Sequence, residues 1–253
     1  MSGSPILVEK GADPRVLVIA FTGFKGGLGL PTFDFFRQTK LTPYSRILTL
    51  DTSLTCYLGG MPPLYADYAS LLAGLREHIA RLAPQKLMFI GASSGGFAAI
   101  LFGHELKADY VHAFSPYTYV GRRQCVKNED KQSIALHAET VDRIDALPAA
   151  VHPFFDLQPI LARHNGKTRY YLHVCRGSPW DFMRVRRLER LPGTLVAGYP
   201  CDGHGVAVVL ARAGLIGDLL DIGNQERMAE VLRERLARKD IQWRARDGDA
   251  DRG

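Results

Sequence analysis

The chain has 253 residues, of which 46% are hydrophobic and 23% charged, and its formal net charge is +6 at pH 7. This composition is typical of a globular protein that buries a large core without help from disulfides. The densest basic run, at 184–190, comes with no nucleic-acid-binding motif, so we expect a solvated helix face there and no nucleic-acid partner.

The predicted elements begin with two apolar runs, at 6–9 and 15–21, which are separated by a turn containing Gly, Asp and Pro. They predict a hairpin or two neighbouring strands. A third strand is expected at 46–51. Apolar residues at helical spacing then predict a helix over 64–82, which Pro84 ends.

The same alternation continues along the chain and predicts an α/β class with a mostly parallel central sheet and helices on both faces. The later strands are expected at 86–90, 110–114, 168–175 and 194–200, and the helices between them at 96–106 and 179–190. His112 and His173 lie within these strands, and we expect them in the core.

Two stretches depart from the alternation. Residues 117–167 are irregular, with several prolines and a predicted helix around 133–147. The segment 224–239 is amphipathic, and we expect it to pack on the body or on a partner. The end, 244–253, has the composition of a disordered tail. The predicted organisation is one domain over 1–222, followed by a C-terminal helix and tail over 223–253.

The four cysteines, Cys56, Cys125, Cys175 and Cys201, form neither a CxxC pair nor a Cys/His cluster with zinc spacing. We therefore expect reduced thiols, no metal and no cofactor. The N-terminal residues lack the basic-then-apolar pattern of a signal peptide, and no uncharged apolar run approaches the roughly 20 residues of a membrane span. These features predict a cytoplasmic protein with no membrane span.

Gly91-Ala92-Ser93-Ser94-Gly95 matches the G-x-S-x-G pattern of a nucleophile elbow, and it lies between a predicted strand and a predicted helix. Residues two before and two after the nucleophile crowd the turn, so neither can be bulky. Ser94 has Ala92 and Gly96 at those positions, which an elbow could tolerate. Ser93 has glycine at both, and it is therefore the candidate nucleophile.

Reactive groups in open α/β sheets collect beyond the carboxyl ends of strands. Asp181 follows the predicted strand 168–175, and His204 follows the strand 194–200 within the Gly-flanked stretch DGHG. The chain order Ser, Asp, His is the α/β-hydrolase order. Asp202 is a rival carboxylate two residues before His204, although it could instead cap the helix that starts near Gly205.

Over roughly residues 5–222 the chain resembles the α/β-hydrolase superfamily, through FTGF at 21–24, GASSGG at 91–96, Asp181 and DGHG at 202–205. The stretches 91–103 and 113–118 also resemble bacterial hydrolase-like proteins associated with polysaccharide or cell-surface glycan biosynthesis. The resemblance implies an α/β-hydrolase fold with a modest lid insertion over 117–167.

The resemblance also implies roles for individual residues. Ser93 would attack a carbonyl carbon, His204 would take its proton, and Asp181 would orient the imidazole. The backbone N–H groups of Ser94 and Phe24 would form the oxyanion hole. The superfamily's loop often begins His-Gly, and this chain has Thr22-Gly23 instead, which leaves the position of the loop open.

Within the insertion, Tyr117 and Tyr119 could stack on a ring or sugar face, and Arg122 could meet an anionic group, because binding residues favour loops at strand ends. Solvated loop side chains are the alternative. His137 also lies in this stretch, and nothing in the sequence assigns it a role.

These features predict a serine hydrolase of the small-acyl esterase or deacetylase type, which cleaves an ester or thioester through an acyl-enzyme. An acyltransferase with the same triad is one alternative, and a non-catalytic hydrolase-like binding protein of a surface-glycan pathway is another. The expected partner is a small-molecule or glycan-linked acyl ester. The sequence leaves open whether the chain forms a homo-oligomer.

Overall fold

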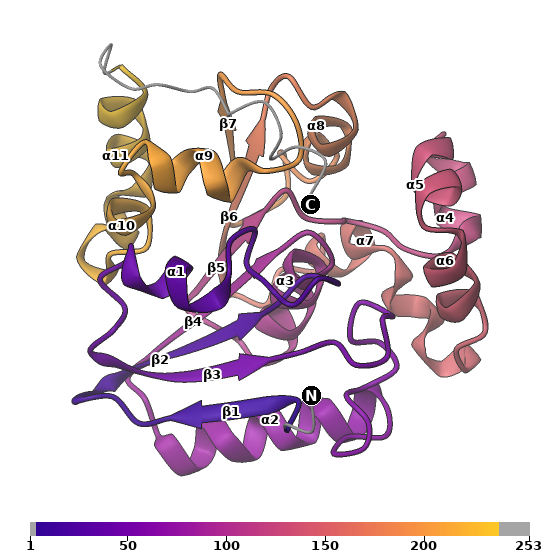
Figure 1. Ribbon diagram of the computed structural model, residues 1–253, viewed down its shortest axis with the longest axis horizontal. Helices are drawn as coiled ribbons and strands as arrows, with labels where there is room; N and C mark the ends of the chain where they lie inside the picture. The colour runs from indigo at the N-terminus through magenta and orange to yellow at the C-terminus, as the bar shows by residue number, and fades with distance from the viewer. Residues whose placement is uncertain (1–3, 238–253) are drawn as a thin grey trace.

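A seven-stranded sheet forms the centre of the computed structural model, which describes residues 4–237 (Figure 1). Its strands are β1 (Ile6–Glu9), β2 (Asp13–Phe21), β3 (Tyr44–Thr49), β4 (Lys86–Ala92), β5 (Tyr110–Phe114), β6 (Arg169–Cys175) and β7 (Thr194–Tyr199). The spatial order is β1-β3-β2-β4-β5-β6-β7, and every neighbouring pair is parallel except β1 and β3. The predicted mostly parallel sheet is thus confirmed.

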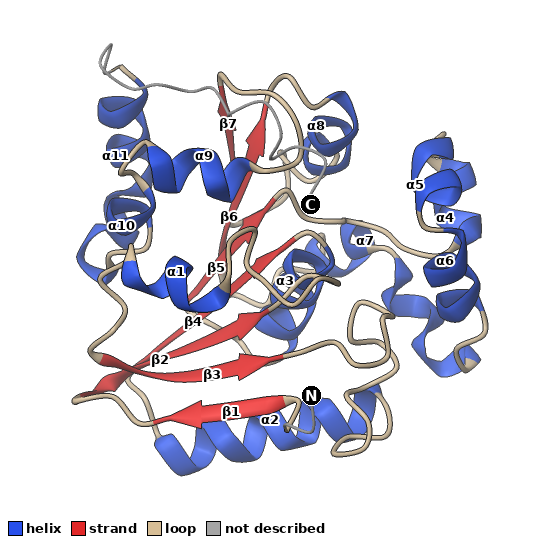
Figure 2. Cartoon of the chain, in the orientation of Figure 1, coloured by secondary structure: helices blue, strands red, loops and turns tan. Residues whose placement is uncertain are grey.

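Helices cover both faces of this sheet, as Figures 1 and 2 show. One face packs against α2 (Tyr68–Leu82) and α3 (Ser94–Glu105), and the other against α1 (Thr32–Arg37), α9 (Val206–Arg212), α10 (Ile216–Leu219) and α11 (Met228–Leu236). The central strands are therefore buried on both faces, which explains why their sequences are continuous apolar runs.

The two ends of α2 are set by its capping residues. The Asp67 side chain caps α2 by accepting a hydrogen bond from the Ser70 N–H, and the Ser70 hydroxyl oxygen accepts one from the Asp67 N–H. The helix therefore begins at Tyr68 rather than at the predicted residue 64. Ala83 then adopts a left-handed conformation before Pro84, as expected for a helix end.

An insertion leaves the sheet between β5 and β6. It contains α4 (Arg122–Lys127), α5 (Lys131–Leu136), α6 (Ala138–Asp145), the 3₁₀ segment η1 (Ala149–Phe155) and α7 (Leu157–Leu161). Figure 2 shows α4, α5 and α6 beyond the carboxyl ends of the strands. The predicted helix around 133–147 is two helices, because the backbone of His137 is not helical.

Two other sequence-based expectations were wrong. The run 6–9 does not lie beside 15–21, because β3 is inserted between β1 and β2. Cys175 and Cys201 are not reduced thiols: they form a disulfide that joins the end of β6 to the segment after β7. Cys56 and Cys125 are free and buried.

The C-terminal segment packs on the body, as predicted. A 3₁₀ turn, η2 (Ile222–Arg227), leads into α11, where Met228, Val231 and Leu232 are buried. The predicted tail at 244–253 lies outside the described residues, and the division at residue 222 stays a prediction. No helix within residues 4–237 combines the length and the apolar character that crossing a bilayer requires.

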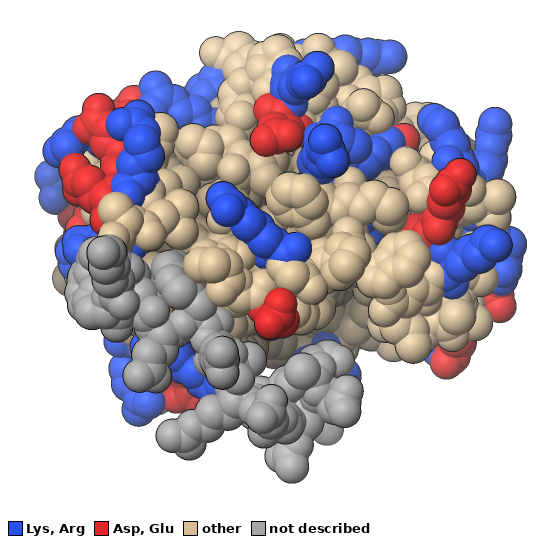
Figure 3. Space-filling view, turned by 90° about the horizontal axis from the view of Figure 1, so that it is seen from above, with Lys and Arg blue, Asp and Glu red and all other residues tan. Residues whose placement is uncertain are grey.

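The surface charges are interspersed. Figure 3 looks down on the molecule from above the view of Figure 1 and shows basic side chains in separate groups, with acidic side chains between them.

Candidate active site

Ser93 occupies a strained turn between β4 and α3. Its backbone has φ 55° and ψ −119°, a conformation that residues with a side chain rarely adopt. The Ser93 N–H donates to the carbonyl of Phe114 at 2.9 Å, and the Ser93 carbonyl accepts from the N–H groups of Phe97 and Tyr117, both at 3.2 Å. The turn is therefore held by the neighbouring strand end, by the helix and by the start of the insertion.

The glycines around Ser93 are required by space. A Cβ on Gly91 would lie 2.1 Å from the carbonyl oxygen of Gly95, and a Cβ on Gly95 would lie 2.1 Å from that of Phe21. Ser94, in contrast, is the first residue of α3 and is fully buried. The structure thus places Ser93, and not Ser94, at the strained position of the elbow.

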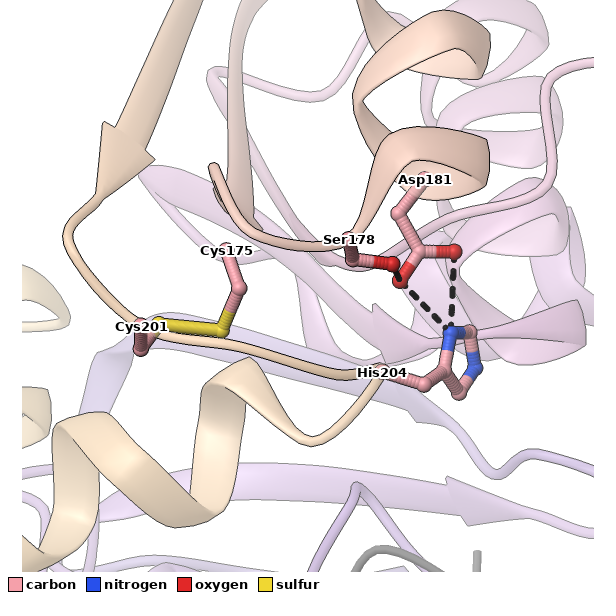
Figure 4. Close-up of a disulfide and its surroundings, with 5 residues drawn as sticks. All are labelled: Cys175, Ser178, Asp181, Cys201 and His204. Carbon is pink, nitrogen blue, oxygen red and sulfur yellow. Dashed lines mark hydrogen bonds and ion pairs between the residues drawn. A yellow bond between two sulfur atoms is a disulfide. The ribbon is translucent and has the colours of Figure 1, made fainter. Parts of the chain in front are cut away.

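His204 and Asp181 meet at the same edge of the sheet. Asp181 lies in the first turn of α8 (Pro179–Arg186), after β6, and His204 lies in the loop between β7 and α9. The Nδ1 atom of His204 is 2.9 Å from Oδ2 and 3.0 Å from Oδ1 of Asp181 (Figure 4). The Asp181 side chain is 3% exposed, whereas that of His204 is 41% exposed.

The environment of Asp181 fixes the role that each atom can take. The Ser178 hydroxyl also donates to Oδ2 of Asp181, at 2.9 Å. Because Nδ1 of the imidazole faces the carboxylate, Nε2 is the atom left for a proton acceptor. The rival Asp202 is exposed and does not pair with His204 within the described residues, and it does not cap α9 either, whose N-cap is Gly205.

Ser93 and His204 share neighbours, although no hydrogen bond joins them within residues 4–237. Burial raises the pKa of Tyr117 to about 12, and the Arg184 charge and a hydrogen bond with the Ser93 side chain oppose this rise. Burial lowers the pKa of His137, and electrostatic interactions with Arg184 and His204 lower it further. Hydrogen bonds to a catalytic base are often long before substrate binds.

The loop that carries Phe24 lies against the elbow. A Cβ on Gly23 would lie 3.2 Å from the carbonyl oxygen of Ala92 and 3.7 Å from Cβ of Ser93. The Ser94 N–H is in the first turn of α3, where N–H groups have no partner within the helix. Both predicted oxyanion donors therefore belong to segments next to Ser93, and their role stays a prediction.

Three rings lie together beside the elbow. The centroids of Phe24 and Tyr117 are 6.3 Å apart, those of Phe24 and His137 are 6.4 Å apart, and those of Tyr117 and His137 are 6.2 Å apart. Tyr117 is thus close to the candidate nucleophile, as its predicted substrate role requires. His137, to which the sequence assigned no role, is brought to the same place by the break between α5 and α6.

The other two predicted substrate residues make contacts within the insertion. Tyr119 is 3% exposed, its hydroxyl donates to Asp130 at 3.0 Å, and the Arg187 guanidinium covers its ring. The Arg122 side chain pairs with Asp142 and Asp145. Substrate roles for Tyr119 and Arg122 stay predictions.

The basic run at 184–190 is a solvated face only in part: Arg186 and Arg190 are exposed as expected, but Arg184 and Arg187 are not. The side chain of Arg184 is 7% exposed and that of Arg187 is 13% exposed, and both form ion pairs with buried carboxylates. The sequence does contain one sign of the pairing between Arg184 and Asp181. Arg184 is three residues after Asp181, so the two side chains share one face of α8.

Comparison with models of protein families finds no match to this chain, and comparison with the sequences of curated proteins finds none either. Solved structures do match. An α/β hydrolase, MGS-MChE2, from the metagenome of lagoon sediments at Mar Chica, Morocco, has a TM-score of 0.54 and 14% identity, over 93% of this chain and 98% of its own.

Two further structures match over most of their length. MenH from S. aureus has a TM-score of 0.52 and 10% identity, over 92% of this chain and 99% of its own. The capsule O-acetyltransferase of Neisseria meningitidis serogroup A has a TM-score of 0.54 and 14% identity, over 90% of both chains. Together with the sheet order, these matches show that the chain has the α/β-hydrolase fold.

Proposed function

We propose that this chain, which has the α/β-hydrolase fold, is a serine hydrolase that cleaves the ester or thioester of a small acyl group through an acyl-enzyme. The observation that carries the proposal is the hydrogen bond between His204 and the buried carboxylate of Asp181, at the edge of the sheet where Ser93 occupies a strained elbow. An esterase from Thermogutta terrifontis, at a TM-score of 0.50, is among the structures with the same fold.

In the first half-reaction, neutral His204 takes the proton of the Ser93 hydroxyl through Nε2 while Oγ bonds to the carbonyl carbon of the substrate. Asp181 accepts the hydrogen bond of Nδ1–H and stabilises the imidazolium. The N–H groups of Ser94 and Phe24 donate to the oxyanion, and the N-terminus of α3 adds its favourable dipole.

The tetrahedral intermediate then collapses. The bond to the leaving alcohol or thiol breaks, and the leaving group takes the proton from His204. In the second half-reaction, His204 takes a proton from water, which attacks the acylated Ser93 and releases the acid. Tyr117 lies against Ser93 and contributes a wall to the site, together with Phe24 and His137.

Acyl transfer is the second candidate, with an alcohol or amine in place of water. The likeness to the Neisseria meningitidis capsule O-acetyltransferase over 90% of both chains motivates it, and a glycan-linked acyl ester is then the expected partner. The same triad serves both reactions, so product analysis with added acceptor sugars separates them: transfer gives an acylated sugar, and hydrolysis gives only the free acid.

The serine is tested with Ser93→Ala and Ser94→Ala, measured by fluorophosphonate labelling and by hydrolysis of p-nitrophenyl acetate. We expect Ser93→Ala to lose labelling and hydrolysis. Ser94→Ala removes a buried hydroxyl and keeps the backbone N–H, so its labelling should persist. Undiminished labelling of Ser93→Ala would overturn the proposal, and labelling lost only in Ser94→Ala would move the nucleophile to Ser94.

A cytoplasmic location stays a prediction from the sequence and is not part of the proposed function. The Cys175–Cys201 disulfide argues against it, because cytosolic thiols are mostly kept reduced. Cell fractionation, with trapping of free thiols at lysis, measures both the location and the state of this pair.

A further inference from the structure

Arg184 contacts the carboxylate of the proposed triad and a carboxylate of the insertion at the same time. We propose that Arg184 is a positioning residue that ties the 117–167 insertion to Asp181 and so fixes the carboxylate that orients His204. This inference rests on the proposed serine hydrolase function, because it assigns His204 as the base.

The guanidinium is shared unequally. Its Nη1 lies 3.3 Å from Oδ1 of Asp181, whereas Nη2 and Nε lie 2.8 Å and 3.1 Å from Oδ2 of Asp130. Asp130 comes from the insertion, where it caps α5 by accepting from the Ser133 N–H, and its side chain has no exposed surface. A buried arginine therefore bridges two carboxylates that belong to separate parts of the chain.

The charges and hydrogen bonds of this cluster favour the ionised form of Asp130. Burial alone would raise the pKa of Asp130, but the Arg184 guanidinium and hydrogen bonds from Ser133 lower it below its usual range. If one partner were lost, the other would be a buried and unpaired charge, which is strongly destabilising. The cluster thus holds Arg184 in one place relative to Asp181.

Arg184 also reaches the nucleophile's surroundings. Its guanidinium carbon lies 4.6 Å from the centroid of the Tyr117 ring, within the range of a cation–π contact. The Thr118 hydroxyl donates to the Arg184 carbonyl at 2.9 Å. The start of the insertion is therefore fixed to the same turn of α8 that presents Asp181.

The consequence for His204 follows from the sharing of Asp181. Its carboxylate accepts hydrogen bonds from His204, Ser178 and Arg184. Arg184 therefore restrains the same carboxylate that orients His204, and Asp130 of the insertion holds Arg184 in place.

Other groups also act on His204. The His137 imidazole interacts electrostatically with it, and the Lys25 charge acts on His137 in turn. Tyr117 stands between Arg184 and Ser93 and is neutral at working pH, because burial raises its pKa to about 12. Arg184 and Asp130 also act electrostatically on His137, so the Arg184 variants below change the surroundings of His137 as well.

The chain provides a matched control three residues further on. Arg187 pairs through Nη1 and Nη2 with Asp156, at 2.7 Å and 2.9 Å, and its guanidinium carbon lies 5.1 Å from the Tyr119 ring. Asp156 belongs to the insertion, as Asp130 does. Arg187 thus makes the same kinds of contact to the insertion, and it makes no hydrogen bond to Asp181 within the described residues.

The test compares Arg184→Met/Asp130→Asn with Arg187→Met/Asp156→Asn, so that neither variant retains an unpaired buried carboxylate. The values of kcat and KM for p-nitrophenyl acetate are measured separately, with thermal unfolding of each protein. We expect kcat of the Arg184 variant to fall about tenfold with little change in KM, because Asp181 no longer holds His204 in one orientation. Both values for the Arg187 variant should match those of the wild type.

Arg184→Lys gives a second measurement that does not depend on folding of the double variants. Lysine keeps the charge but lacks the planar fork that bridges two carboxylates. Its kcat should fall several-fold with little change in KM. An unchanged kcat in the Arg184 double variant, an equal loss of kcat in the Arg187 variant, or a wild-type kcat in Arg184→Lys would each overturn the inference. If the wild type showed no fluorophosphonate labelling that depends on Ser93, the proposed function itself would be overturned.

Discussion

The Nδ1 atom of His112 lies 3.0 Å from Nε2 of His173, and neither imidazole has any exposed surface. The remaining bonds fix the direction of every proton. Gln225 donates from its amide nitrogen to two backbone carbonyls, so its oxygen faces His112 Nε2, which must donate. His112 Nδ1 then accepts from His173, and His173 Nδ1 accepts from the Tyr199 hydroxyl at 2.8 Å. Both histidines are satisfied only when neutral.

We predict that this pair makes stability fall in mild acid. Burial lowers the pKa of His112 to about 4 and that of His173 well below its usual value. The unfolded chain protonates each near pH 6.5, so it binds more protons than the folded chain below that pH. Stability is therefore complete above about pH 6.5 and is lost as the pH falls towards 4, by about 1.4 kcal/mol per pH unit for each histidine.

Urea unfolding at a series of pH values measures this slope. His173→Phe should lose about half of it, whatever its stability at pH 7, because one of the two buried groups no longer titrates. His152 is exposed, and His152→Gln serves as the control that keeps the slope. A slope that His173→Phe leaves intact would assign the acid sensitivity to other groups.

The Cys175–Cys201 disulfide should contribute measurably to stability. It joins the segments that lead to Asp181 and His204, and it closes a loop across a separation of 26 residues. The chain-entropy model gives about 3.5 kcal/mol for a loop of this length. We therefore expect urea unfolding with and without a phosphine reductant to differ by about this amount in the wild type.

The double variant Cys175→Ala/Cys201→Ala should unfold identically with and without reductant. Cys125 is a free and buried cysteine, so Cys125→Ala should keep the sensitivity of the wild type. A wild-type protein whose unfolding ignores the reductant, and whose four cysteines all react with a thiol reagent after denaturation, would show that the disulfide does not form.

The strained backbone of Ser93 predicts an unusual order of stabilities. With φ at 55° and ψ at −119°, a side chain at this position costs about 1–3 kcal/mol, which glycine avoids. Part of the gain is offset because glycine makes the unfolded chain more flexible. We expect Ser93→Gly to be about 1 kcal/mol more stable than Ser93→Ala by urea unfolding.

The neighbouring serine gives the opposite order and hence the control. Ser94 is the first residue of α3, where glycine loses more backbone entropy on folding than alanine does. Ser94→Gly should therefore be less stable than Ser94→Ala. If glycine were the less stable substitution at both positions, the elbow would carry no strain.

Much of the site was predictable because the elbow and the strand ends leave local signals. Glycine is required on both sides of Ser93, because a Cβ on Gly91 or on Gly95 would lie 2.1 Å from a backbone oxygen. Asp181 and His204 could be located because parallel strands bring their carboxyl ends to one edge. The hydrogen bond between them settles which carboxylate faces the histidine, which spacing alone left open.

The rest depended on packing that the sequence does not display. Cys175 is the last residue of β6 and Cys201 follows β7, and only the adjacency of these strands brings the two within reach. A turn between β1 and β2 favoured a hairpin, but β3 pairs with both strands. Arg184 was hidden in a basic run, because burial of a guanidinium requires Asp130, which is 54 residues away.

The proposed acid of the triad can be separated from its rival. Asp181→Asn keeps the shape of the side chain but removes the charge that stabilises imidazolium, and it can hold the wrong tautomer of His204. Loss of the corresponding charge in a serine protease lowers kcat about 10⁴-fold, so we expect a fall of at least a thousandfold in kcat for p-nitrophenyl acetate. Asp202→Asn changes an exposed carboxylate that does not pair with His204 within the described residues, and its kcat should match that of the wild type. A larger loss in Asp202→Asn than in Asp181→Asn would mean that His204 changes partner when substrate binds.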